Sequence, residues 1–177
     1  PMSPAPPTSR SSGALRLTVA VCTHNPKPAV LARTLAALRA QSLPTAYWEL
    51  LLVDNDSTNG APAAADLAWH PHARRLHEPV LGIAAARQCA VAALLAGPSP
   101  LLLFVDDDNL LAPDYLATGL ALADADPRLA CWGGQLLPEY EVPPPEWFGP
   151  FARYLAVFPL AADRVVEAFT GNHDCLP

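Results

Sequence analysis

The stretch LLLFVDDDN, residues 101–109, joins an apolar run to three adjacent carboxylates. Residues 101–105 have the length and composition of a buried strand, and the aspartates follow at its carboxyl end. Ligands of open α/β sheets bind beyond the carboxyl ends of parallel strands, so this position favours a binding site. If the strand continues, Asp106 and Asp108 share one face about 6–7 Å apart, and Asp107 points the other way.

Three carboxylates at one strand end need a positive partner. Two ionised carboxylates at that separation repel by about 2–3 kcal/mol at an effective dielectric constant of about 20. Mg²⁺ commonly takes one or two protein carboxylates and fills its other positions with water and substrate phosphates. The aspartates therefore predict a Mn²⁺ or Mg²⁺ site, with Asp106 and Asp108 as ligands. The alternative is a solvated acidic turn before a helix.

Two earlier segments show the same pattern of an apolar strand followed by polar residues. The apolar runs cover residues 17–22 and 50–53. Three strand ends are then expected to meet at one edge of a sheet: Thr23-His24-Asn25, Asp54-Asn55-Asp56 and Asp106-Asp107-Asp108. The first two can supply hydrogen bonds and a stacking surface for a base. Together with a cation, they predict a nucleoside-diphosphate site.

Helical patterns separate these strands. Helices are expected after Pro28, over residues 63–69, over residues 83–95 and from Pro113 onward. Arg87 lies in the first turns of the third helix, where helix dipole and free amide groups favour a phosphate. It is therefore a candidate counter-charge, although a lone arginine on an alanine-rich helix is often a solvated surface residue.

The order of elements predicts an α/β fold with a Rossmann-like, mostly parallel sheet flanked by helices. Further strands are expected at residues 75–77 and 128–136, where Gly133 and Gly134 would let the backbone approach a ligand. Three regions follow from the pattern: a disordered tail at residues 1–14, an α/β domain at residues 15–137 and a Pro-rich loop opening residues 138–177.

Composition excludes several classes of function. A net charge of −6 argues against binding to nucleic acid or to an anionic membrane surface. Neither the four scattered cysteines nor the histidines at 70, 72 and 77 match the spacing of a zinc site. The sequence shows neither a signal peptide nor an apolar run of about 20 residues, so we expect a cytoplasmic protein, at most peripheral to the inner membrane face.

From about Leu17 to Gln135 the sequence resembles the family-2 glycosyltransferases with the A fold. Four segments carry the resemblance in order: VAVCTHN at 19–25, LLVDNDSTNG at 51–60, LGIAAARQCAV at 81–91 and FVDDDNLLAPDYL at 104–116. They look like the family's opening strand, its VDDGSTD segment, its G-x-x-x-ARN helix start and its DxD strand with the following helix. Residues 15–137 would then form the nucleotide-sugar-binding domain.

The resemblance implies a metal-dependent transferase that moves a sugar from a nucleoside-diphosphate sugar, expected to be a UDP-sugar, to an acceptor hydroxyl with inversion. The acceptor would be a carbohydrate, a lipid-linked molecule or another hydroxyl compound. The resemblance also implies a role for each site residue. Thr23 and His24 would border the base, Asp54 would hydrogen-bond it, and Asn25 would also bind the nucleotide sugar. Arg87 would lie near the diphosphate, Asp106 and Asp107 would hold the ribose or the metal, and Asp108 would bind the metal.

The resemblance leaves the catalytic base unassigned. In the family the base follows the Pro-rich loop, and no matching motif occurs here. Four carboxylates remain as candidates that spacing does not separate: Glu139, Glu141, Glu146 and Asp174. Residues 138–177 would then be an incomplete acceptor-side region, whose exposed apolar surface could support a homo-oligomer.

Two other functions stay open at this point. A non-catalytic module that binds a nucleotide sugar or a metal would need no base. A haloacid-dehalogenase-type phosphatase also uses a DxD motif, but its motif usually opens the domain, whereas two βα units precede this one. A P-loop nucleotide hydrolase is excluded, because the sequence contains no GxxxxGK[ST] run.

Overall fold

In the computed structural model of the protein, residues 14–155 are described, except for the side chains of residues 152, 153 and 155. The chain divides between Leu129 and Ala130 into two compact units. The predicted tail, apart from residue 14, and the candidate base Asp174 lie outside the described residues. No described helix has both the length and the apolar character that crossing a membrane requires.

The first unit is built on a parallel sheet with the order β3-β2-β1-β4. Its described strands are β1 (Leu17–Thr23), β2 (Trp48–Asp54), β3 (Ala73–His77) and β4 (Leu101–Asp106). In the register, Thr23 lies opposite Asp54, and Cys22 lies opposite Asp106. The carboxyl ends of β1, β2 and β4 therefore meet at one edge, which confirms the predicted α/β fold class.

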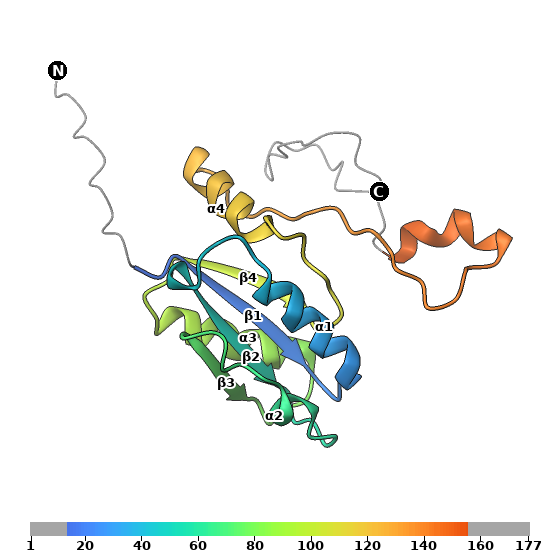
Figure 1. Ribbon diagram of the computed structural model, residues 1–177, viewed down its shortest axis with the longest axis horizontal. Helices are drawn as coiled ribbons and strands as arrows, with labels where there is room; N and C mark the ends of the chain where they lie inside the picture. Colours follow the sequence, from blue (N-terminus) through green and yellow to red (C-terminus); the bar gives the residue numbers. More distant parts are fainter. Residues whose placement is uncertain (1–13, 156–177) are drawn as a thin grey trace. The chain divides into compact units, whose positions relative to one another are not determined.

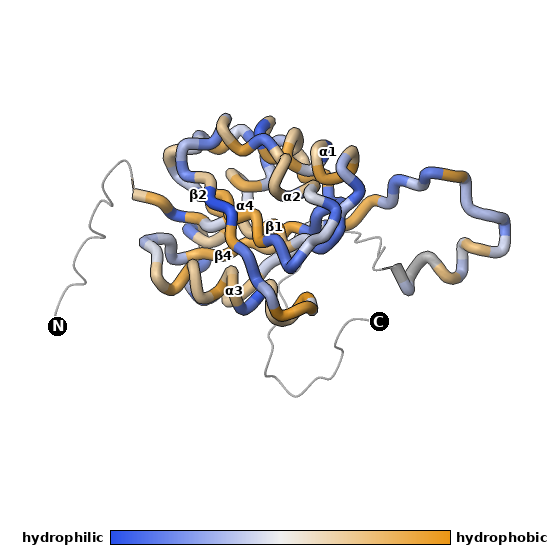
Figure 2. Tube along the Cα trace, turned by 90° about the horizontal axis from the view of Figure 1, so that it is seen from below, coloured by the Kyte–Doolittle hydropathy of each residue, from blue (hydrophilic) through white to orange (hydrophobic). Residues whose placement is uncertain are grey.

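Helices cover both faces of the sheet. On one face, α1 (Pro28–Arg39) and α4 (Tyr115–Ala125) bury leucines against odd-numbered residues of β1, such as Val19. On the other face, α3 (Ile83–Leu95) packs Ala86 and Ala90 against the sheet. Figure 1 draws α1 in front of the strands and α3 behind them, and in Figure 2 the strands lie between these two helices. Because β1 and β2 are covered on both faces, most of their residues are apolar, with Thr18 and Glu49 buried among them.

The helix starts follow simple local rules. Pro28 occupies the first turn of α1, where its missing N–H breaks no hydrogen bond. The short α2 (Ala61–Ala64) follows Gly60, whose φ of 68° is left-handed. A helix was expected later, over residues 63–69, so this prediction was correct in kind but wrong in its bounds. Two 3₁₀ turns complete the described elements, η1 (Thr45–Tyr47) and η2 (Glu146–Leu155).

Two sequence predictions about the sheet are wrong. Residues 128–136 form no strand, and the expected approach of a ligand to Gly133 and Gly134 stays a prediction. β4 is an edge strand of the described sheet, and of its apolar residues only Val105 is buried while Phe104 is 37 % exposed. A strand forms by pairing with a neighbour, and residues 130–136 belong to the second unit.

The left-handed backbone at Asp56 gives a stability prediction. Asp56 has φ of 56°, a conformation that costs L-residues energy and glycine almost none. Its ion pair with His77, 3.8 Å long and exposed, contributes little. Asp56→Gly should therefore stabilise the fold by about 0.5–1 kcal/mol, measured by urea unfolding. Asp56→Ala, which lacks both the flexibility and the polar side chain, should destabilise it, and a gain in both variants would refute the assignment.

Candidate functional site

An open pocket of about 530 Å³ lies where the carboxyl ends of β1, β2 and β4 meet the start of α3. This volume is typical of a small-molecule site. All of its lining residues belong to the first unit: Cys22, Thr23, His24, Asn55, Leu81, Gly82, Ile83, Ala86, Asp106, Asp107 and Asp108. The structure therefore brings together the predicted residues at 23, 24, 106, 107 and 108.

The three aspartates reach the pocket by a different geometry from the predicted one. β4 ends at Asp106, and the Asn109 N–H donates to the Asp106 carbonyl at 3.1 Å, which closes a turn. Asp107 and Asp108 are the central residues of this turn, so the strand alternation that would place Asp106 and Asp108 on one face does not apply. That prediction was wrong because the chain turns one residue after the apolar run. The turn lets all three side chains line the pocket.

The turn is held from two elements. Thr23 at the end of β1 donates its hydroxyl to the Asp107 carboxylate. Thr34, fully buried on α1, donates to the Asp107 carbonyl at 2.8 Å. Sequence reasoning missed Thr34, although a hydroxyl among the buried leucines of α1 was a detectable signal. These bonds fix the position of the acidic turn relative to the sheet.

Arg87 lies beside the pocket without lining it. Its guanidinium is 3.4 Å from an Asp106 carboxylate oxygen and lies over the Phe104 ring, 5.3 Å from the ring centroid. Asp108 is exposed, and no hydrogen bond to its carboxylate is recorded among the described residues. The edge of the pocket therefore carries three carboxylates and one arginine, and the carboxylate of Asp108 is available to a ligand.

The His24 ring is oriented by hydrogen bonds at both nitrogens. Its Nδ1 is 2.7 Å from the Asn55 carbonyl oxygen, which can only accept, so Nδ1 carries the proton. Its Nε2 accepts from the Asn25 amide at 3.0 Å. Because both ring nitrogens are hydrogen-bonded in the neutral tautomer, His24 can contact a ligand in the pocket through the faces of its ring.

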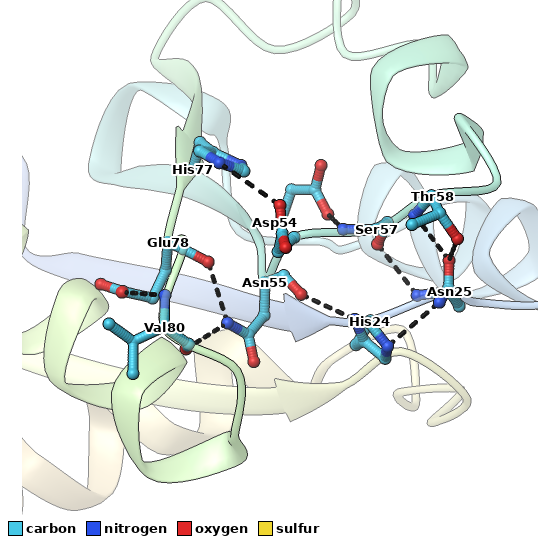
Figure 3. A network of polar contacts seen from close by, with 10 residues as sticks. His24, Asn25, Asp54, Asn55, Ser57, Thr58, His77, Glu78 and Val80 are labelled. Atoms are coloured by element: carbon cyan, nitrogen blue, oxygen red, sulfur yellow. Dashed lines mark hydrogen bonds and ion pairs between the residues drawn. The ribbon is translucent and has the colours of Figure 1, made fainter.

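Two predicted site residues, Asn25 and Asp54, do not line the pocket. Asn25 has φ of 48°, and its side-chain oxygen accepts the backbone N–H groups of Thr58 and Asn59 at 2.8 and 3.1 Å. Asp54 accepts the Ser57 N–H at 3.0 Å. Both therefore fasten the loop after β2, as Figure 3 shows.

Asn55 lines the pocket, whereas sequence reasoning placed it only in the Asp54-Asn55-Asp56 strand end and did not count it among the site residues. It is 4 % exposed, and its Nδ2 donates to the carbonyls of Glu78 and Val80 at 2.9 and 2.7 Å. Its Oδ1 accepts the Gly82 N–H at 2.8 Å. Figure 3 shows its side chain directed at the segment that follows β3. The partners are more than 20 residues away in sequence, so no local pattern could identify them.

The chemistry of the donor set fits a cation that is shared with a ligand. No cluster of three or more His, Cys, Asp or Glu side chains that could hold a metal occurs in the part of the chain that the structure describes. A Mg²⁺-type ion needs only one or two protein carboxylates when phosphates and water complete its shell. Asp108 and Asp106 are the residues that would hold such an ion.

The environment of the thiol in the pocket disfavours a thiolate. Burial is the main cause that raises the pKa of the Cys22 thiol to about 11, which favours the protonated form at neutral pH. A nucleophilic cysteine has a lowered pKa instead. We therefore assign Cys22 no covalent role.

Comparison with known proteins identifies related sequences and folds. Residues 18–162 match the family model for glycosyl transferase family 2. A curated protein from Sinorhizobium fredii, described as uncharacterized protein y4gI, is 32 % identical over 114 residues. That match covers 63 % of this chain and 12 % of the relative, so this chain spans only a small part of that protein's length.

Solved structures share the fold of part of this chain. The mannosyltransferase PcManGT from Pyrobaculum calidifontis, in complex with GDP-Man and Mn²⁺, is 30 % identical with a TM-score of 0.54, over 63 % of this chain and 33 % of that chain. TarS of S. aureus, in complex with UDP-GlcNAc, is 20 % identical with a TM-score of 0.51, over 63 % of this chain and 32 % of that chain. This chain therefore spans about a third of these proteins.

Proposed function

The chain belongs to glycosyl transferase family 2, and on this premise we propose that its pocket binds a nucleotide sugar together with Mn²⁺ or Mg²⁺. The observation that carries the proposal is the meeting of three carboxylates, Asp106 to Asp108, with the start of α3 in one pocket. Carboxylates so close together favour a cation, and a helix start favours the phosphates of the nucleotide.

Each of the predicted site residues has a proposed part in binding. Asp108 and Asp106 would hold the cation, and the ring face of His24, with Thr23 beside it, would border the base. Asp107 would face the ribose. The contact of Asp54 and Asn25 with the nucleotide stays a prediction, supported by their position next to the lining residues Asn55 and His24 in the sequence.

Arg87 would exchange its partner when the donor binds. Its guanidinium is 3.4 Å from Asp106 and 46 % of its side chain is exposed, so the pair is a weak surface pair that can separate. A cation at Asp106 would compete with Arg87 for the carboxylate and release the guanidinium toward the diphosphate. The cation and the Arg87 guanidinium would then both stabilise the negative charge of the diphosphate.

The reaction class we propose is transfer of a sugar to an acceptor hydroxyl with inversion of the anomeric carbon. A bound divalent cation supplies charge stabilisation to the departing nucleoside diphosphate. The candidate bases Glu139, Glu141 and Glu146 lie in the second unit, and the structure assigns the role to none of them. Since the chain spans a third of the matched structures, acceptor and base are questions for the whole protein.

The donor is expected to be a UDP-sugar, with a GDP-sugar as the second candidate. One structural relative was solved with UDP-GlcNAc and another with GDP-Man and Mn²⁺. These complexes support a nucleotide-sugar donor for this chain, and the 30 % identity to the mannosyltransferase keeps the guanosine nucleotide in the test set.

A thermal-shift screen tests this proposal. UDP, GDP, UDP-GlcNAc and GDP-Man are each added with Mn²⁺, with Mg²⁺ or with a chelator. A ligand at 100 times its Kd adds about 2.7 kcal/mol to the free energy of unfolding, so the melting temperature should rise by several degrees with nucleotide and cation together. Uridine and guanosine, which lack the diphosphate, are the controls. A melting temperature that none of the nucleotides changes would refute the proposal.

A further inference from the structure

Asn55 stands out because it bonds two separate segments at the pocket, residues 23–24 and residues 78–82. Its backbone N–H donates to the Thr23 carbonyl at 2.9 Å, and its carbonyl accepts the His24 ring N–H. Its side chain bonds the segment of residues 78–82 that follows β3. We propose that Asn55 is a positioning residue: it holds residues 78–82 as one wall of the pocket, and the position of this wall sets the affinity for the nucleotide.

The side chain of Asn55 is fully used inside the protein. An amide has two N–H donors, and both are directed at carbonyls, those of Glu78 and Val80. The oxygen accepts the Gly82 N–H, and the residue is 4 % exposed. A side chain engaged in this way acts on a ligand through the wall that it holds. The inference rests on the proposed function, because it concerns affinity for the nucleotide.

The wall itself has little apolar packing to hold it. Leu81, Gly82 and Ile83 line the pocket, yet the side chains of Leu81 and Ile83 are 62 % and 57 % exposed, and that of Val80 is 64 % exposed. Polar contacts therefore have to fix this segment, and three of them come from Asn55. Without these bonds we expect the segment to sample other positions.

Gly82 makes the position of the wall matter for binding. It has φ of 129°, a backbone conformation that L-residues rarely adopt, and it directly precedes Ile83, the first residue of α3. The Gly82 amide bonded to Asn55 thus sets the direction in which α3 begins. A shift of this amide would move the first turn of α3, which contributes Ile83 and Ala86 to the pocket.

The test compares two isosteric substitutions. Asn55→Asp keeps the oxygen that accepts from Gly82 but replaces both donors by a carboxylate that faces two carbonyl oxygens. Asn59→Asp is the matched control: Asn59 also donates to a carbonyl, that of Pro26 at 2.9 Å, and accepts the Ala61 N–H at 3.0 Å. Both changes add one negative charge, and the side-chain hydrogen bonds of Asn59 are to residues outside 78–82.

Calorimetric titration with UDP and with GDP, each with Mn²⁺, is the first readout. Asn55→Asp should weaken binding about tenfold or more, whereas Asn59→Asp should change it less than about threefold. The loss should be the same for UDP and GDP, because a displaced wall does not distinguish bases. Equal losses in both variants, or a loss confined to one nucleotide, would overturn the positioning role.

Hydrogen exchange on the full chain is the second readout, and it does not depend on nucleotide. The amides of Val80 and Gly82 should exchange faster in Asn55→Asp, while those of β1 and β2 keep their protection. Asn55→Ser, a smaller neutral change, replaces the aspartate variant if that one fails to fold. Faster exchange with unchanged affinity would refute the inference, whereas a wild-type chain that binds no nucleotide would refute the proposed function.

Discussion

Asp108→Asn should remove the cation-dependent part of nucleotide binding and weaken the affinity for UDP with Mn²⁺ by about 100-fold. The substitution keeps the size of the side chain and removes the negative charge that a hard cation requires. Among the described residues no hydrogen bond depends on this carboxylate, and the side chain is exposed, so the fold should keep its stability. Calorimetric titration with and without Mn²⁺ measures the cation-dependent and the cation-independent parts of the affinity for UDP.

The matched control is Asp114→Asn, an exposed aspartate at the N-cap of α4 that makes no side-chain capping bond and does not line the pocket. It lowers the negative charge of the first unit by the same amount. We expect its affinity for UDP with Mn²⁺ to stay within about threefold of wild type, since distant exposed charges are screened. Equal affinity of wild type and Asp108→Asn would show that Asp108 does not hold the cation.

The fold should lose stability in acid because His70 is buried in its neutral form. His70 is 3 % exposed, and its ring lies 4.2 Å from the Trp48 ring and 5.2 Å from the Trp69 ring, measured between centroids. Its Nδ1 accepts the His72 N–H at 3.1 Å, which a protonated ring cannot do. Burial is the main cause that lowers the pKa of His70 to about 4, and His72 lowers it further.

The direction of the effect follows from proton linkage. Above a pH of about 6.5, His70 is neutral in both the folded and the unfolded chain, and no stability is lost. Between about pH 6.5 and the folded pKa, the unfolded chain binds a proton that the fold excludes, so the free energy of unfolding falls. The loss should total about 2–3 kcal/mol and level off below the folded pKa.

Urea unfolding at a series of pH values between 7.5 and 4 measures this loss. His70→Phe keeps a planar ring against the tryptophans and removes the titrating group, so its stability should depend less on pH. His72→Gln, at an exposed position, removes only the smaller cause of the lowered pKa of His70, so its slope should be slightly below that of wild type and above that of His70→Phe. Comparing the slopes separates His70 from the carboxylates that also titrate in acid. Parallel curves for wild type and His70→Phe would contradict the assignment.

The parts of the fold that the sequence predicted correctly are those specified by local patterns. β1 and β2 contain uninterrupted apolar segments because both faces are covered, and α3 begins and ends at the predicted residues 83 and 95. Length, composition and the residues that interrupt these runs suffice to identify such elements. The fold class followed from their alternation.

The failures concern features that depend on distant contacts. The sequence RLACWGGQL predicted a strand at residues 128–136, but a strand exists only where a neighbour pairs with it. The turn after Asp106 depends on bonds from Thr23 and Thr34, which lie more than 70 residues away. The sequence therefore predicted which residues gather around the aspartates in the candidate site. The geometry of the acidic turn and the contacts of Asn55 required the structure.

The most direct test of the nucleotide site is an NMR titration of the full chain with UDP, first with Mg²⁺ and then with Mn²⁺. With Mg²⁺, we expect shift changes at the amides of Thr23, His24 and Gly82. Replacing Mg²⁺ by paramagnetic Mn²⁺ should broaden the amides of residues 106–109 more strongly than any others. Shift changes or broadening centred elsewhere, or none at the ends of β1 and β4, would contradict a shared cation and diphosphate site in this pocket.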